Sequence, residues 1–266
     1  MTQDPDAIHE TVRKHYAERI RSSTSCCSSD ACCSTDANFY PAELLASLPE
    51  GEAAVSYGCG DPITLAALTP GQIVLDLGSG AGLDCFFAAQ KVGETGRVIG
   101  VDMTPEMIER AQASAERMKL QNVDFRLGYL EELPVDEGTI DVVISNCVIN
   151  LAPNKGKVFA EVARVLKPGG RLAVSDIVTD GPLPEQIKSS LSAWAGCIAG
   201  AIDIDAYRGA MQDAGLVDLA VSPTYFDEAI IEEAVGDMGQ DLDLGSWNKE
   251  AISRTVFSAR ITARKP

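Results

Sequence analysis

The sequence predicts an α/β fold of the Rossmann-like class, with a mostly parallel seven-stranded sheet and helices on both faces. The first observation is a glycine turn: the apolar run 73–77 ends at Gly78, Gly80 and Gly82, and a helical pattern follows. The second is the alternation of strand and helix patterns, which is typical of a parallel sheet. The third is size, because 266 residues with 45% hydrophobic content can bury a large core.

The N-terminal part predicts helices around a thiol-rich segment. Residues 8–20 have apolar or aromatic side chains at every fourth position, which predicts an amphipathic helix. Residues 22–35 are rich in Ser and Cys and predict either a mobile polar segment or an arm that captures a soft metal or metalloid. Its thiols are Cys26, Cys27, Cys32 and Cys33. A short helix over 41–47, a glycine loop over 56–62 and a helix from Pro62 to Leu68 follow.

Three strand–loop–helix patterns form the middle of the chain. The strand 73–77 leads through the glycine turn into a helix over 83–92 that Gly93 ends. The strand 97–102 leads to a helix from Thr104, with Pro105 in its first turn, to Met118. The strand 123–127 runs into the sequence Gly-Tyr-Leu-Glu. The strand 140–145 ends at Asn146 and Cys147 and precedes a helix over 155–166.

The C-terminal part completes the expected sheet. The expected elements are a strand over 171–177, helices over 182–199 and 205–214, and strands over 217–226 and 255–262. We divide the chain into an N-terminal helix, Cys-rich segment and cofactor-covering loop (1–60), a cofactor-binding core (61–180), and a substrate-binding region with the last two strands (181–266).

Charge and cysteine content limit the possible partners and location. With 22 Lys and Arg against 39 Asp and Glu, the net charge is −17, which argues against nucleic acid and membrane partners. No apolar run is long enough to span a membrane and the N-terminus is polar, so we expect a cytoplasmic protein. Eight cysteines without an export signal favour reduced thiols for soft-metal binding or redox chemistry.

The expected site lies at the carboxyl ends of the strands, where parallel sheets bind ligands. Asp102 ends the second strand 26 residues after Asp76, where an acidic residue binds ribose hydroxyls in such folds. Three thiols from distant segments can converge on the same edge: Cys59 in the glycine loop, Cys147 after a strand, and Cys197 on a later helix.

These segments resemble the arsenite S-adenosylmethionine methyltransferases, members of the class I S-adenosylmethionine-dependent methyltransferases. The matching motifs are YGCG at 57–60, the glycine turn with Asp76 inside it, SNCVINL at 145–151 and WAGC at 194–197. The resemblance covers nearly the whole chain. It implies methyl transfer from S-adenosylmethionine to trivalent arsenic, as arsenite or methylarsenite, for arsenic detoxification.

The resemblance also implies residue roles. Cys59, Cys147 and Cys197 are expected to bind arsenic and carry the catalysis, with arsenite or methylarsenite arriving as thiol conjugates and a thiol reductant such as thioredoxin or glutathione renewing the cysteines. Tyr129 stands where many relatives have an Asp, so the adenine contact is assigned to Leu130 and Glu131. The full set of expected cofactor-binding residues is Tyr57, Asp76, Gly78, Gly80, Asp102, Met103, Leu130, Glu131 and Asn146.

Two other functions remain open from the sequence. A methyltransferase acting on a small organic acceptor, such as a quinone- or sterol-like molecule, uses the same cofactor motif but leaves the three cysteines unexplained. A protein that sequesters arsenic without turnover explains the cysteines, but the cofactor residues Asp76, Gly78, Gly80 and Asp102 argue against it.

Overall fold

The computed structural model describes residues 4–23, 40–46, 48, 58, 60–181, 200–225 and 255–266. Several predictions lie outside the described residues: the thiols at 26, 27, 32 and 33, Tyr57, Cys59, Cys197 and the helix over 182–199. Within the described ranges, none of the helices has the length and apolar character needed to cross a membrane.

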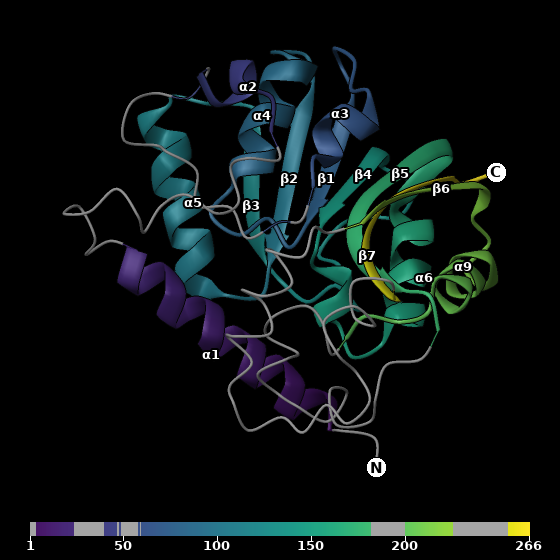
Figure 1. Cartoon of the computed structure of the whole chain (residues 1–266). Coiled ribbons are helices and arrows are strands. Elements are labelled where there is room, and N and C mark those ends of the chain that lie inside the picture. Colours follow the sequence, from purple (N-terminus) through teal and green to yellow (C-terminus); the bar gives the residue numbers. More distant parts are fainter. Residues whose placement is uncertain are drawn as a thin grey trace.

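A single seven-stranded sheet forms the centre of the protein, in the order β3-β2-β1-β4-β5-β7-β6 (Figure 1). The strands are β1 (Ile73–Leu77), β2 (Arg97–Asp102), β3 (Val123–Leu127), β4 (Ile140–Asn146), β5 (Leu166–Thr179), β6 (Val217–Tyr225) and β7 (Val256–Arg264). The first five pair in parallel, and β7 runs antiparallel to both β5 and β6. The predicted fold class is confirmed.

Helices cover both faces of the sheet because neighbouring side chains along each strand point to opposite sides. Leu75 faces a core that includes Phe159 and Tyr207, whereas Val74 faces a second core that includes Phe87 and Ala111. The first core is covered by α6 (Lys155–Val165) and α9 (Ile204–Asp213). The second is covered by α2 (Ala42–Ala46), α3 (Pro62–Ala66), α4 (Leu83–Val92) and α5 (Pro105–Arg117).

The helix α1 (Pro5–Ser23) belongs to neither layer and lies across the carboxyl ends of the strands (Figure 1). Ile8 and Val12 on one face of α1 pack against Cys147 and Leu151, which follow β4. Near its other end, Arg21 forms an ion pair with Glu106 of α5. Thus α1 is fixed to the core on both sides of the edge where parallel sheets bind ligands.

The observed elements depart from the predicted bounds mainly at β5. This strand begins at Leu166, five residues before the predicted strand over 171–177, because the Gly169–Gly170 segment pairs with the C-terminal end of the chain. The N–H of Gly169 donates to Lys265 O at 2.9 Å, and the N–H of Lys265 donates to Gly170 O at 2.9 Å. Glycine pairs are typical of turns, but this one is held in the sheet by its hydrogen bonds to Lys265.

We predict that Gly82→Ala destabilises the protein more than Gly138→Ala. Both glycines have positive φ, 95° and 63°, so either alanine is strained by about 1–2 kcal/mol. A Cβ at Gly82 lies only 2.8 Å from Phe86 and 2.9 Å from Phe125, whereas one at Gly138 meets none of the described residues within 4 Å. Crowding of this kind costs about 1–3 kcal/mol more. Urea unfolding of the two variants measures the difference, and equal losses would contradict the packing role of Gly82.

Candidate functional site

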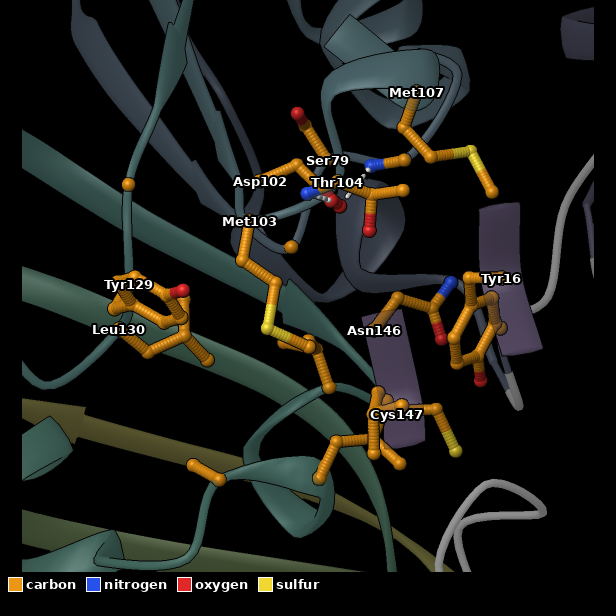
Figure 2. A pocket seen from close by; sticks show the side chains of 18 of the residues that line it. Tyr16, Ser79, Asp102, Met103, Thr104, Met107, Tyr129, Leu130, Asn146 and Cys147 are labelled. Atoms are coloured by element: carbon orange, nitrogen blue, oxygen red, sulfur yellow. Dashed lines mark hydrogen bonds between the residues drawn. The ribbon is translucent and has the colours of Figure 1, made fainter. Parts of the chain in front are cut away.

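A cavity of about 110 Å³ opens at the carboxyl edge of the sheet, beneath α1 (Figure 2). Six segments line it: one face of α1, Gly58, the glycine turn with the start of α4, the end of β2 with the start of α5, the loop after β3, and the end of β4 with the residues after it. Residues from these segments include Tyr16, Ser79, Asp102, Tyr129 and Cys147.

The glycine turn opens its backbone to the cavity. Gly78 and Gly80 have φ values of 66° and 51°, a left-handed region that favours glycine. At Gly78 a Cβ would lie 2.2 Å from Val148, whereas a Cβ at Gly80 meets nothing within 4 Å in the described structure. The turn therefore needs Gly78 for close packing, and Gly80 leaves room at the cavity wall.

The Asp102 carboxylate orders the turn from the end of β2. It accepts hydrogen bonds from the backbone N–H of Gly80 at 2.9 Å and of Thr104 at 2.8 Å. Burial raises the pKa of Asp102, and the N–H groups of Thr104 and Gly80 oppose that rise. Figure 2 shows Asp102 beside Ser79 and Thr104 at one end of the cavity, with Cys147 at the other.

Two buried polar atoms on the cavity wall lack hydrogen-bond partners in the described part of the chain: Ser79 Oγ and Glu131 Oε1. The Nε2 atom of His9 lies 3.4 Å from Glu131 Oε1, within ion-pair range, and the His9 ring packs on Tyr129 with centroids 4.8 Å apart. Buried polar groups normally have partners, so these atoms indicate a place for a polar ligand.

A hydrogen-bond network joins the far side of the turn to the end of β4. The hydroxyl of Tyr40 donates to Asp84 Oδ1 at 2.9 Å. The Nδ2 group of Asn146 reaches Tyr40 Oη at 3.0 Å, Gly60 O at 2.9 Å and Asp84 Oδ2 at 3.3 Å. Asn146 therefore ties together a segment before the sheet, the glycine loop and the first turn of α4.

Burial changes the acidity of the groups around this network. Burial raises the pKa of Asp84 to about 7, against the lowering effect of the hydrogen bonds from Tyr40 and Asn146. Burial and the charge of Asp84 raise the pKa of Asp76 well above its usual value. Burial and the neighbouring Asp76 also raise the pKa of the Cys85 thiol, which donates to Asp76 Oδ2 at 3.2 Å. Cys85 is thus a neutral buried thiol.

Cys147 combines a cavity position with an unusual backbone. Its φ is +61°, in the left-handed region that non-glycine residues rarely adopt, and its N–H donates to Ser175 O at 2.7 Å. Only 4% of its surface is exposed, since Ile8 and Val12 of α1 lie over it. Strained conformations of this kind cluster at functional sites.

The cavity brings together most of the predicted site residues that the structure describes. Those on its wall are Gly78, Gly80, Asp102, Met103, Leu130, Glu131, Asn146 and Cys147. Asp76 is not among the lining residues: it is 2% exposed and lies behind the turn against Cys85. Its cofactor contact stays a prediction, as do the roles of Tyr57, Cys59 and Cys197, which lie outside the described residues.

Sequence reasoning missed several residues of the site. His9 lines the cavity together with Val12 and Tyr16. These three share one helix face, at spacings of three and four, so the pattern was present but gave no indication of a ligand. Asp84 reads as an ordinary acidic residue in a first helical turn.

The charges on the wall are predominantly acidic. Carboxylates come from Asp84, Asp102 and Glu131, and no Lys or Arg occurs among the lining residues that the structure describes. Such a wall attracts a cation and disfavours a phosphorylated ligand. The glycine turn, the acidic end of β2 and this charge together fit a nucleoside that carries positive charge, as S-adenosylmethionine does at its sulfonium and amino groups.

Comparisons with known proteins agree with this chemistry. The chain matches the family described as "Methyltransferase domain" over residues 68–215. An arsenite methyltransferase from Halobacterium salinarum is 43% identical, over 99% of this chain and 68% of that protein. One from Aquipseudomonas alcaligenes is 38% identical, over 86% and 69%. The crystal structure of an arsenic (III) S-adenosylmethionine methyltransferase from Chlamydomonas reinhardtii gives a TM-score of 0.67 at 32% identity, over 84% and 72%.

We predict that Asp84→Asn changes how stability depends on pH. The pKa of Asp84 is about 7 in the folded protein and 3.8 as its ordinary value, so the folded state holds a proton that the unfolded state releases between these values. The parent protein should therefore lose stability relative to Asp84→Asn as the pH rises from 4 to about 7. Unfolding in urea at several pH values measures this difference. A difference that stays constant with pH would show that Asp84 titrates normally.

Proposed function

The chain belongs to the arsenite methyltransferase family, and we propose that it holds trivalent arsenic through the thiolates of Cys59, Cys147 and Cys197 during methyl transfer. It is an S-adenosylmethionine-dependent arsenite methyltransferase. The observation that carries the proposal is the Cys147 thiol on the wall of the acidic cavity that fits the cofactor. We also propose that the activity serves arsenic detoxification, with methylarsenite as a second substrate.

Each part of the cofactor is assigned to residues at or near the cavity wall. Asp102, at the end of β2, is assigned to the ribose hydroxyls. Leu130 and Glu131, whose Oε1 has no hydrogen-bond partner among the described residues, are assigned to the adenine, and Tyr57 is assigned to cover the cofactor. Asp84 and Asn146, at the other side of the turn, offer polar groups near its charged amino acid portion. The remaining assigned contacts are Gly78, Gly80, Met103 and Asp76.

The proposed methyl transfer depends on the position of the reacting atoms and on the exclusion of water more than on proton transfer. When bound, S-adenosylmethionine supplies an electrophilic methyl group to the lone pair of arsenic. Thiolates are the soft ligands that trivalent arsenic prefers, and three of them leave that lone pair available. The burial of Cys147 under Ile8 and Val12 keeps water away from the arsenic position. The methyl transfer requires no general base, and none is proposed.

The neighbours of Cys59 in the sequence support its proposed role. A Cβ added to Gly58 would lie 2.2 Å from the Asn146 side chain, and one added to Gly60 would lie 2.6 Å from Ser175 Oγ. Gly58 and Gly60, which flank Cys59 in the sequence, therefore lie close to Asn146 and Ser175. These are the residue before Cys147 and the residue that accepts its backbone hydrogen bond. The proposal adds Cys197 as the third thiolate, with thioredoxin or glutathione restoring cysteines that turnover oxidises.

Methylation assays with purified protein, arsenite, S-adenosylmethionine and a thiol test the proposal. Soluble and volatile methylarsenicals should form with the parent, and Cys147→Ser should lower the rate by at least about a hundredfold because a soft ligand is lost. The matched control is Cys85→Ser, which alters a buried thiol outside the cavity and should keep most of the activity. No methylarsenicals from the parent, or equal rates in the two variants, would contradict the proposal.

The same assay separates the roles of the cysteines. We predict that Cys147 and Cys197 are needed for methylation of both arsenite and methylarsenite. Cys59→Ser should still methylate methylarsenite, because that substrate has one fewer site for a thiolate. Product analysis by chromatography with arsenic detection measures both reactions. Loss of methylarsenite methylation in Cys59→Ser would show that all three thiols serve both steps.

We predict that Asp102→Ala weakens S-adenosylmethionine binding by about tenfold to a hundredfold, since hydrogen bonds to a charged carboxylate contribute about 1.5–3 kcal/mol. Isothermal titration calorimetry measures the affinity. Asp213→Ala, which removes an equal charge from the exposed end of α9, is the control and should bind as the parent does. Unchanged affinity in Asp102→Ala would remove this residue from the cofactor site.

A further inference from the structure

A second cluster of buried charged groups lies behind Cys147, outside the cavity wall. It consists of Asp176 on β5, Lys155 at the start of α6 and Tyr207 on α9. Asp176 and Tyr207 are fully buried and Lys155 is 8% exposed. Burial of charges is costly unless their partners are well placed, and the methylation chemistry uses none of the three.

The cluster converges on Asn150, within the short 3₁₀ helix η2 (Ile149–Leu151) that follows Cys147. The backbone N–H of Asn150 donates to the Asp176 carboxylate. Its carbonyl accepts from Lys155 Nζ at 3.3 Å, and its side-chain Nδ2 donates to Ile177 O. Three polar groups of one fully buried residue are therefore fixed, two of them to β5 and one to α6.

The Asp176 carboxylate is itself held on several sides. It accepts from the Ile177 N–H at 3.0 Å and from the Tyr207 hydroxyl at 3.2 Å. Burial raises the pKa of Asp176 to about 7, while the positive charge of Lys155 and these hydrogen bonds lower it. Lys155 also donates to Ala152 O at 3.2 Å, just beyond η2.

This arrangement accounts for the backbone of Cys147. The parallel pair Asn146 and Ser175 is the last in the register of β4 and β5, so Cys147 lies level with Asp176. The left-handed φ of Cys147 is unfavourable for a residue with a Cβ, and it persists only where the flanking chain is fixed. On one side the flanking chain is β4, and on the other it is η2, which Asn150 ties to β5.

We propose that Asp176 is a positioning residue: through Asn150 it fixes η2 and keeps Cys147 in the left-handed conformation that places its thiol in the cavity. Loss of the interaction between Asp176 and Asn150 lets the backbone at Cys147 relax, which redirects the Cα–Cβ bond and exposes the thiol. The inference concerns the position of a thiol and holds whether or not arsenic is its ligand. Only its kinetic consequence depends on the proposed function.

Alkylation of the protein by iodoacetamide tests this inference without arsenic. The rates at Cys147 and Cys85 are read from the same sample by peptide mass spectrometry, so Cys85 serves as an internal control for unfolding. In Asp176→Asn we expect the rate at Cys147 to rise about tenfold, because the hydrogen bonds to a charged carboxylate are replaced by weaker ones to a neutral amide, with Cys85 unchanged. An unchanged Cys147 rate, or equal rises at both cysteines, would overturn the inference.

Two further variants make the test specific. Asn150→Ala removes the Nδ2 bond to Ile177 O, one of the two bonds that tie η2 to β5, and keeps the backbone bond to Asp176. It should raise the Cys147 rate, but by less than Asp176→Asn does, and it tests the anchoring of η2 if Asp176→Asn does not fold. Tyr207→Phe removes another hydrogen bond to Asp176 but leaves Asn150 in place, and should change the Cys147 rate by less than about twofold. A rise in Tyr207→Phe equal to that in Asp176→Asn would mean general loosening and would contradict the proposal.

The kinetic consequence is measured on Asp176→Asn as well. Because Asp176 is not among the described lining residues, S-adenosylmethionine should bind with parental affinity. The kcat for arsenite methylation should fall by about tenfold or more, since misplacement of a reacting group is costly. An equal kcat alongside an exposed Cys147 would leave the positioning of the thiol supported and would instead count against Cys147 as an arsenic ligand.

Discussion

The parallel register of β1, β2, β4 and β5 is the constraint on which the site depends. Leu77 pairs with Val101 on one side and with Ser145 on the other, and Asn146 pairs with Ser175. The next residue of each strand therefore reaches the same level at the edge of the sheet. A shift of one residue in any pair would turn its side chains to the opposite face and bury the wrong set. The burial of both faces of the sheet, between two helical layers, fixes this register.

The same edge holds an unusual concentration of buried carboxyl groups. Burial raises the pKa of Asp76, Asp84 and Asp102, and the charge of Asp84 raises that of Asp76 further. In the absence of a ligand these three groups oppose stability at neutral pH. A cation bound at this wall would offset that cost, which would link its binding to folding. The net charge of −17 is thus not only a solubility feature, because part of it faces the cavity.

Local patterns were sufficient for the sheet and for much of the site. The glycine turn, Asp102 and Cys147 each follow directly from where a strand ends, so the sequence places them at one edge. Local sequence patterns do not reveal which distant segments are in contact. The position of His9 beside Glu131, the hydrogen bond from Tyr40 to Asp84 and the start of β5 at Leu166 all depend on tertiary packing. The left-handed backbone of Cys147 is also invisible in the sequence, where glycine is the usual signal.

We propose that Cys147 is one of three thiolates that bind arsenic at the cofactor cavity. X-ray absorption at the arsenic edge measures the number of sulfur ligands directly. The measurement is best made in a background where Cys26, Cys27, Cys32 and Cys33 are replaced by serine, so that the N-terminal thiols cannot substitute. The account predicts three sulfur ligands in this background and two after the further change Cys147→Ser. An unchanged sulfur count in the Cys147→Ser protein would contradict it.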